Sequence, residues 1–226
     1  MWRLVESQNV ISSDRLVEDP DDQPLLEELI EEVKPLIPEG ARHLPKLIAT
    51  PFRYWHQAAS RFRRANEKPG ILYTSETETA SVAEMAYYRL LFHSRSPASI
   101  RPKNITEHTS FTVRAQATRA LDLTRMPYVL RRADWTDPGD YGACQEFGAA
   151  ARQIGTQAIR YESVRDPAAQ ANLAIFDPGA VDGDSLQIIR SWHFRFEGRR
   201  LSAYAAYPSP QHLAFTFEQF AMTRPV

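Results

Sequence analysis

The order of strand-like and helical segments is the sequence feature that most constrains the fold of this chain. Short segments of alternating apolar and polar residues dominate, and few helical segments lie between them. A doubly wound parallel sheet requires a helix between successive strands, so this order does not favour one. The sequence also lacks a Gly-x-Gly-x-x-Gly turn and a Gly-x-x-x-x-Gly-Lys-[Ser/Thr] loop, the phosphate-binding motifs of such folds. It therefore predicts an α+β fold of twisted, mostly antiparallel sheets with a few helices.

Three segments have the apolar spacing of amphipathic helices. The first is Pro24–Lys34, whose polar face is acidic and which ends where prolines and a glycine follow. The second begins at a cap provided by Thr77 or Thr79 and continues to about Phe92. The third covers residues 137–154 and ends at a glycine.

Period-two alternation and short apolar runs predict strands elsewhere in the chain. Ile48–Tyr54 is predicted to be a strand that enters a basic loop, and Ser110–Leu123 is predicted to be a longer strand. Two segments joined by Glu197-Gly198 are expected to form a hairpin or an extended β segment. The remaining predicted strands are Met1–Val5, Ile71–Thr74, Ala158–Tyr161, Asn172–Phe176, Leu186–Phe196 and Arg199–Tyr207.

Composition and charge exclude several classes of protein. The length of 226 residues and a hydrophobic content of 43% suit a single globular domain over residues 1–226. A formal net charge of -1 gives no overall attraction to nucleic acid or an anionic membrane. Cys144 is the only cysteine, and the histidines lack metal-ligand spacing, so we expect neither an internal disulfide nor a metal site. Because the chain has no signal peptide and no long apolar run, we expect it to be cytoplasmic.

Glu84 is the most unusual polar residue of the second predicted helix. It is flanked by Val82, Ala83, Met85 and Ala86, and burying a carboxylate in apolar surroundings is costly unless it is paired or functional. The ordinary explanation is a structural Arg–Glu pair within the core. The alternative is a catalytic carboxylate.

A second polar cluster follows about eighty residues later. It comprises Arg160–Pro167, with Ser163 in a polar turn, and is followed by Asn172–Pro178. By itself Ser163 is an ordinary turn hydroxyl. Periodicity alone does not bring this cluster close to Glu84.

These fragments, taken in order, resemble the RES domain family. The later motif reads Tyr-x-Ser-x-Arg-Asp-Pro over Tyr161–Pro167 and Asn-x-Ala-x-Phe-Asp-Pro over Asn172–Pro178. The resemblance extends over about residues 48–180, which leaves an N-terminal helical extension and a C-terminal β-rich extension. The earlier fragments are Thr50-Pro-Phe-Arg-Tyr54, Ser60-Arg-Phe62, Gly70-Ile-Leu-Tyr73, Glu78-Thr-Ala80 and Ala83-Glu84.

The resemblance implies a set of site residues. Glu84 matches the glutamate of the family's helix and Arg61 matches its loop arginine, which makes both of them expected catalytic residues. Arg53, Tyr73 and Ser163 are expected to bind NAD together with Arg61. The loop departs from the family's common form, Gly-Arg-Phe-Asn-Pro-Pro-Gly, and reads Ser-Arg-Phe-Arg-Arg-Ala-Asn over residues 60–66. Arg63 is therefore an alternative to Arg61 as the functional loop arginine.

The resemblance also implies an activity. RES proteins are toxins of toxin–antitoxin pairs with a fold similar to ADP-ribosyltransferases, and members cleave NAD+ by phosphorolysis or hydrolysis. The implied function is an NAD+-degrading toxin, with NAD+ as substrate and inorganic phosphate as a possible acceptor. An ADP-ribosyltransferase that modifies a cellular protein is the alternative within enzymes, and a phosphate-binding module without catalysis is the alternative outside them.

The implied partners are a cognate Xre-type antitoxin and a second copy of the chain in a homodimer. Nucleic acid and membranes are not expected as direct partners. The aromatic-rich tail from Ser191 to Val226 is a candidate part of such an interface, although its aromatic residues also suit a core.

Overall fold

The computed structural model describes residues 1–7, 19, 22–54, 58–95, 104–198, 200–206 and 210–222. Within these residues nine strands form one sheet, and every neighbouring pair except β4 and β5 is antiparallel. This confirms the predicted α+β class with a mostly antiparallel sheet. In spatial order the strands are β4 (Ala120–Asp122), β5 (Ala158–Glu162), β6 (Ala171–Ile175), β2 (Leu72–Ser75), β1 (Trp2–Glu6), β3 (Thr106–Ala115), β7 (Val181–Glu197), β8 (Arg200–Ala205) and β9 (His212–Thr216).

The sheet is opened between β1 and β2. These two strands share one residue pair, Trp2 with Ser75, whereas β1 pairs with β3 along its whole length. Each strand therefore has its main partner on its other side, β3 for β1 and β6 for β2. The divergence coincides with a cavity lined by residues of both strands.

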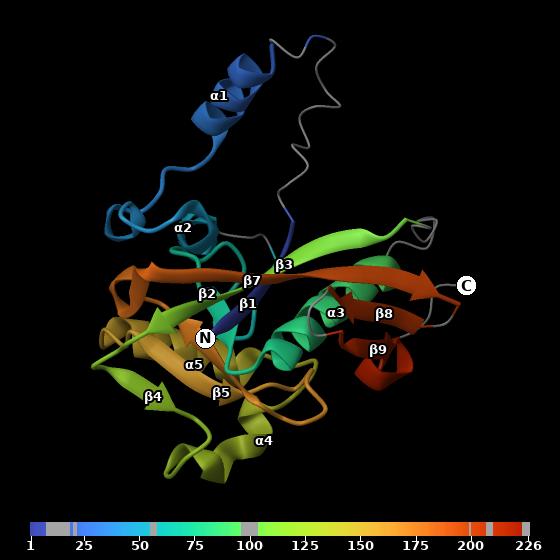
Figure 1. Cartoon of the computed structure of the whole chain (residues 1–226). Coiled ribbons are helices and arrows are strands. Elements are labelled where there is room, and N and C mark those ends of the chain that lie inside the picture. The colour runs from blue at the N-terminus through green and yellow to red at the C-terminus, as the bar shows by residue number, and fades with distance from the viewer. Residues whose placement is uncertain are drawn as a thin grey trace.

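Helices cover both faces of the sheet (Figure 1). Successive strand residues point to opposite faces, and Leu4 packs in the core cluster of α3 while its neighbour Val5 packs in that of α2. Helix α1 stands away from the sheet (Figure 1) and leaves Leu25 and Leu29 at least half exposed. The helices are α1 (Gln23–Val33), α2 (Lys46–Arg53), α3 (Glu78–Arg95), α4 (Arg132–Trp135) and α5 (Gly142–Gln153), with 3-10 turns at Glu39–Ala41, Tyr128–Arg131, Pro178–Ala180 and Glu218–Phe220.

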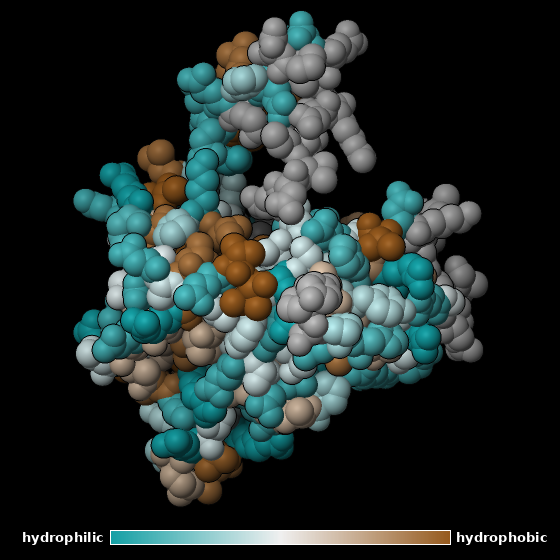
Figure 2. Space-filling view, in the orientation of Figure 1, coloured by the Kyte–Doolittle hydropathy of each residue, from teal (hydrophilic) through white to brown (hydrophobic). Residues whose placement is uncertain are grey.

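The surface seen in Figure 2 is mostly polar. Hydrophobic residues form separate groups there, one of them at the far end of the projecting α1. Scattered exposed apolar residues are normal for a globular protein. Within the part of the chain that the structure describes, no helix has the length and apolar character needed to cross a membrane.

The strand predicted at Ile48–Tyr54 is wrong, because this segment forms the helix α2. Ile48, Ala49 and Phe52 are all buried, and their spacing of one and four residues is that of one helix face. Pro45 precedes the helix in an extended conformation, so the chain turns into the helix there. The short apolar run had suggested a strand, a known ambiguity of such runs.

Other boundaries also differ from the predictions. The strand expected over Ser110–Leu123 divides into β3, which begins at Thr106, and the short β4. The helix expected from Asp137 begins at Gly142, because the carboxylates of Asp137 and Asp140 accept backbone N–H groups and form turns there. Helix α4 and strand β9 were not predicted.

The remaining predicted elements are confirmed within a few residues. Thr77 is the cap of α3, since its hydroxyl accepts the backbone N–H of Ala80 at 3.2 Å. Strands β7 and β8 form the expected hairpin, and β9 pairs with β8 to extend it.

His108 on β3 gives the fold a pH dependence. Its side chain is fully buried, and its ring lies against Phe194 with 4.6 Å between ring centroids. Burial, with a smaller contribution from the nearby Arg89 charge, lowers the pKa of His108 from 6.5 to about 4. Between about pH 6.5 and pH 4 the unfolded chain therefore binds a proton at His108 that the folded chain does not bind. This difference favours the unfolded state, so the contribution of His108 to stability is lost as the pH falls through this range.

We expect the His108 contribution to the free energy of unfolding to fall by up to about 3 kcal/mol between pH 7 and pH 4, at 1.36 kcal/mol per pH unit. Urea unfolding of the wild type and of His108→Phe at several pH values measures it as the difference between their slopes. His43→Gln, at an exposed histidine, is the matched control and keeps the wild-type slope. Equal slopes for wild type and His108→Phe would contradict the assignment.

Candidate functional site

A cavity of about 550 Å³ opens where β1 and β2 diverge. Helix α3 provides one wall and the segment 58–63 provides another, with Tyr141 and Tyr161 closing the side toward α5. Its size is within the range of small-molecule sites. Of the residues expected from the sequence, Glu84, Arg61, Arg63 and Tyr73 line this cavity, and Arg53 and Ser163 do not.

Glu84 projects from α3 toward the end of the sheet formed by β5 and β6. Its Oε1 accepts a hydrogen bond from Ser163 Oγ at 2.8 Å and another from Asn172 Nδ2 at 2.7 Å. Within the described residues both of its hydrogen bonds go to Oε1. The two polar clusters that periodicity left apart in the sequence therefore meet at this carboxylate.

Ser163 is buried beneath Glu84 rather than at the cavity wall. Its hydroxyl oxygen accepts the backbone N–H groups of Arg165 at 3.2 Å and Asp166 at 3.1 Å, which directs its proton to Glu84. Ser163 was expected to bind NAD, and in the structure its hydroxyl orients Glu84.

Arg61 is buried, at 7% exposure, and its guanidinium bridges to the region between α4 and α5. Nη1 donates to the carbonyl oxygens of Trp135 at 2.9 Å and Asp137 at 3.1 Å, and the guanidinium lies 4.6 Å from the ring centroid of Tyr141. In the part of the chain that is described, its hydrogen bonds all start from Nη1. Nε and Nη2 therefore have capacity for a ligand.

Arg63, the alternative loop arginine, holds its own loop together. Its Nη2 donates to the carbonyl of Ala58 at 2.8 Å, and its Nη1 donates to the carbonyls of Arg64 and Glu67. Both arginines line the cavity, but their partners differ: Arg63 closes a local turn, whereas Arg61 connects the loop to another part of the fold.

Tyr73 on β2 anchors the same loop. Its hydroxyl forms a 2.9 Å hydrogen bond with Ser60 Oγ and accepts the backbone N–H of Phe62 at 3.2 Å. Burial raises the pKa of Tyr73, so its hydroxyl stays protonated at neutral pH. It thereby fixes the segment that carries Arg61.

Arg53 points away from the cavity, at the end of α2. Its Nε donates to the carbonyl of Pro35, and its Nη1 pairs with Glu31 Oε1 at 2.5 Å. These contacts tie α1 and its following segment to the body of the protein.

Arg3 is a cavity residue that the sequence reasoning missed. It lies on β1 in the gap beside β2, and its Nη1 donates to the carbonyl of Tyr73 at 2.6 Å. Its Nε is buried and has no hydrogen-bond partner among the described residues. Burial lowers the pKa of Arg3 to about 10, which leaves it charged at neutral pH. The sequence feature that could have indicated Arg3 is a charged residue within the otherwise apolar stretch Trp2–Val5. Its position beside β2 became known only from the structure.

Arg165 and Asn172 were also missed as individual residues, although both lie in the quoted motifs. Arg165 is 4% exposed, donates to Tyr141 Oη at 2.8 Å, and lies 3.5 Å from the ring centroid of Tyr87. Within the described ranges no carboxylate forms an ion pair with Arg3, Arg61 or Arg165. Three guanidiniums without carboxylate partners make this cavity suited to an anionic ligand.

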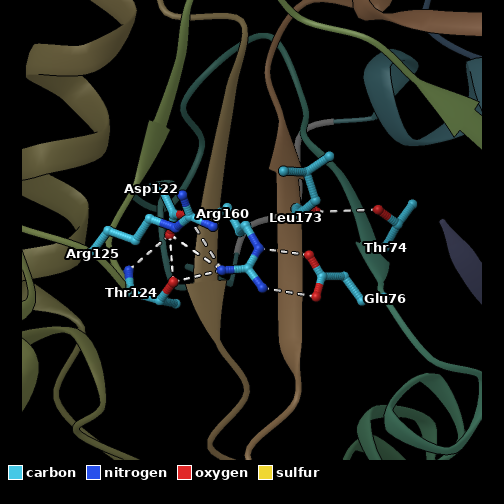
Figure 3. A network of polar contacts seen from close by, with 7 residues as sticks. All are labelled: Thr74, Glu76, Asp122, Thr124, Arg125, Arg160 and Leu173. Carbon is cyan, nitrogen blue, oxygen red and sulfur yellow. Dashed lines mark hydrogen bonds and ion pairs between the residues drawn. The ribbon is translucent and has the colours of Figure 1, made fainter.

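Arg160, on the other face of β5, stabilises the segment that leads into α3 (Figure 3). Its Nε and Nη2 donate to the two carboxylate oxygens of Glu76, and its Nη1 reaches Asp122 and Thr124. The side-chain hydrogen bond from Arg160 lowers the pKa of Glu76. This network lies between β4 and the start of the helix that carries Glu84.

Among the residues described here, no group of three or more His, Cys, Asp or Glu side chains is placed to hold a metal ion.

The family model of the RES domain matches residues 37–197, which is most of the chain. The chain therefore belongs to the RES domain family, as its motifs had predicted. A chain in the crystal structure of the M. tuberculosis MbcT–MbcA toxin–antitoxin complex is similar, with 16% sequence identity and a TM-score of 0.45 over 62% of this chain and 74% of that one. No curated protein matches the sequence at a significant level. Arg3 lies before the region that the family model covers.

Gly148 sets the distance between α5 and the loop that carries Arg61. A Cβ at this position would lie 2.6 Å from the carbonyl oxygen of Phe62, a backbone atom. We expect Gly148→Ala to lower the free energy of unfolding by about 1–2 kcal/mol, because overpacking outweighs the ~1 kcal/mol that alanine gains in a helix. Gly139→Ala is the control, since its Cβ would meet a side-chain atom at 3.8 Å. Chemical denaturation of both variants checks this, and equal stability of the two would contradict it.

Proposed function

We propose that this chain cleaves NAD+ at the nicotinamide–ribose bond. The observation that carries the proposal is one cavity in which an oriented carboxylate, Glu84, lies with three guanidiniums that have no carboxylate partner within the described residues. Membership of the RES family supports the same substrate, because the family resemblance implies NAD+ cleavage. A dinucleotide has the two features such a cavity selects, an anionic pyrophosphate and flat rings.

In the proposed reaction the bond between ribose C1′ and the nicotinamide nitrogen breaks. The bonding electrons go to the ring nitrogen and neutralise its positive charge, so nicotinamide leaves as a neutral molecule. Positive charge develops on the ribose, as in glycoside cleavage, and the Glu84 carboxylate stabilises it. Water or phosphate then forms a new bond at C1′ and loses a proton.

The cationic residues have a separate role in this proposal. Arg3 and Arg61 hold the pyrophosphate through charge-assisted hydrogen bonds, with Nη2 of Arg3 and Nε and Nη2 of Arg61 as the available donors. Arg3 takes the place that the resemblance assigned to Arg53, whose guanidinium is used by Glu31 and Pro35. Tyr73 and Tyr141 offer ring surface for the nicotinamide.

The proposed biological role is that of a toxin neutralised by a cognate Xre-type antitoxin that blocks the cavity. A homodimer and a single domain over residues 1–226 remain part of the proposal. Transfer of ADP-ribose to a protein uses the same carboxylate and the same bond cleavage, and differs only in the acceptor.

We expect the purified protein to consume NAD+ and release nicotinamide, and Glu84→Gln to reduce kcat by about 100- to 1,000-fold, because the stabilising charge is removed. Chromatographic measurement of nicotinamide with and without inorganic phosphate distinguishes phosphorolysis from hydrolysis. Labelling of protein by tagged NAD+ identifies the transferase instead. Intact NAD+ and unlabelled protein in every reaction, with a folded wild type, would overturn the proposal.

Arg3→Ala and Arg61→Ala are each expected to raise KM by about 10- to 100-fold. This range corresponds to the loss of one hydrogen bond to a charged group, which contributes ~1.5–3 kcal/mol to binding. Arg64→Ala is the matched control, since Arg64 lies in the same loop with an exposed side chain. Arg53→Ala separates the two assignments of the second arginine. A larger effect from Arg53→Ala than from Arg3→Ala would restore the assignment made from sequence.

A further inference from the structure

Asn172 is a polar side chain at the centre of the sheet. It lies on β6 between Ser75 of β2 and Tyr161 of β5, and it is 2% exposed. Its side chain points to the face that α3 covers, where Nδ2 donates to Glu84 Oε1 at 2.7 Å. A buried position in a central strand is ordinarily apolar, so the amide requires an explanation.

The orientation of the amide is determined by Glu84. With Nδ2 toward the carboxylate, Oδ1 is buried without a hydrogen-bond partner among the described residues. Rotating the amide by 180° would place its oxygen against the negatively charged Oε1 of Glu84. The protein therefore keeps an unsatisfied buried acceptor in order to keep a donor on Glu84, an arrangement that is rare in folded proteins.

Ser163 completes the arrangement from the other side. Its hydroxyl donates to the same oxygen, and its lone pairs are occupied by the N–H groups of Arg165 and Asp166. Two donors from the β5–β6 end of the sheet thus fix Oε1. Oε2 has no hydrogen bond within the described ranges and remains for the substrate.

We propose that Asn172 is a positioning residue for the cleavage reaction, which holds Glu84 through Oε1 so that Oε2 faces the developing charge. The proposal rests on the proposed function, because it assigns to Asn172 the orientation of the carboxylate in that reaction. An amide kept at the expense of its own oxygen serves function rather than stability. Activity is therefore expected to respond more strongly than stability when it is replaced.

Asn172→Leu tests this difference, because leucine has the same branched shape but neither donor nor acceptor. We expect kcat to fall by about 10- to 100-fold with little change in KM, since the carboxylate is displaced while the pyrophosphate contacts remain. The midpoint of thermal unfolding is expected to change little, because removing the unpartnered acceptor offsets the loss of one donor to Glu84. Leu173→Met, on the same strand with its side chain on the opposite face, is the control and keeps both values. Unchanged kcat in Asn172→Leu would overturn the proposal.

Asn172→Asp gives a second test that does not depend on activity. Two carboxyl groups facing each other are expected to share one proton, so that one carboxyl pKa of the pair rises and falls back when Glu84→Gln is added, measured by NMR titration of labelled aspartate and glutamate carboxyl groups. Burial raises the pKa values of Tyr88 and Tyr161, and the charge of Glu84 adds to both, so these hydroxyls stay neutral over the same range. Ser163→Ala removes the other donor to Glu84 Oε1 without adding a carboxylate, and its carboxyl titration is compared with that of Asn172→Asp.

The two proposals fail in different ways. A folded wild type that leaves NAD+ intact overturns the proposed function, while the titration still reports whether Asn172 contacts Glu84. A carboxyl titration of Asn172→Asp that is unaffected by adding Glu84→Gln overturns the positioning role even if NAD+ is consumed. An upward shift together with the fall in kcat of Asn172→Leu supports both.

Discussion

The hydrogen bonds of Glu84 connect the helix that carries it to the opposite end of the sheet. A carboxylate on the inner side of a helix is tolerable only where other groups replace the water it has lost. Ser163 and Asn172 do this, and they are within reach because α3 lies close to the sheet. The close approach comes from small residues on the helix, since Ala80, Ala83 and Ala86 are all buried at 1% exposure or less.

The opening between β1 and β2 determines what the cavity contains. Because these strands share one residue pair, the Tyr73 carbonyl is free to accept Arg3 rather than a backbone N–H of β1. Arg61 and Arg165 reach the same space from a loop and from the turn after β5, and both are held by neutral oxygen atoms. Carbonyl and hydroxyl partners fix a guanidinium in place without neutralising it. The positive charge is therefore retained for a ligand.

Sequence reasoning identified the helix of Glu84, the hairpin and most strands because their apolar periodicity survives in the structure. It failed at α2, where Ile48, Ala49 and Phe52 form a helix face too short to distinguish from a strand. It placed Arg61, Tyr73 and Glu84 at one site through the order of the family's motifs, and all three line one cavity. Arg53 was chosen from the same fragment order, but the helix it ends directs it toward Glu31.

The sequence by itself determined the fold class and the family, and it predicted Glu84 as the carboxylate of the site, because these depend on local patterns and on motifs read in order. Only the tertiary structure decided which polar groups meet that carboxylate and which arginines face the cavity. The contacts concerned join residues far apart in the chain: 70 positions separate Arg3 from Tyr73, 79 separate Ser163 from Glu84, and 88 separate Asn172 from Glu84. Local periodicity specifies which side of an element is apolar, but the order of the strands in the sheet specifies which polar side chains become neighbours.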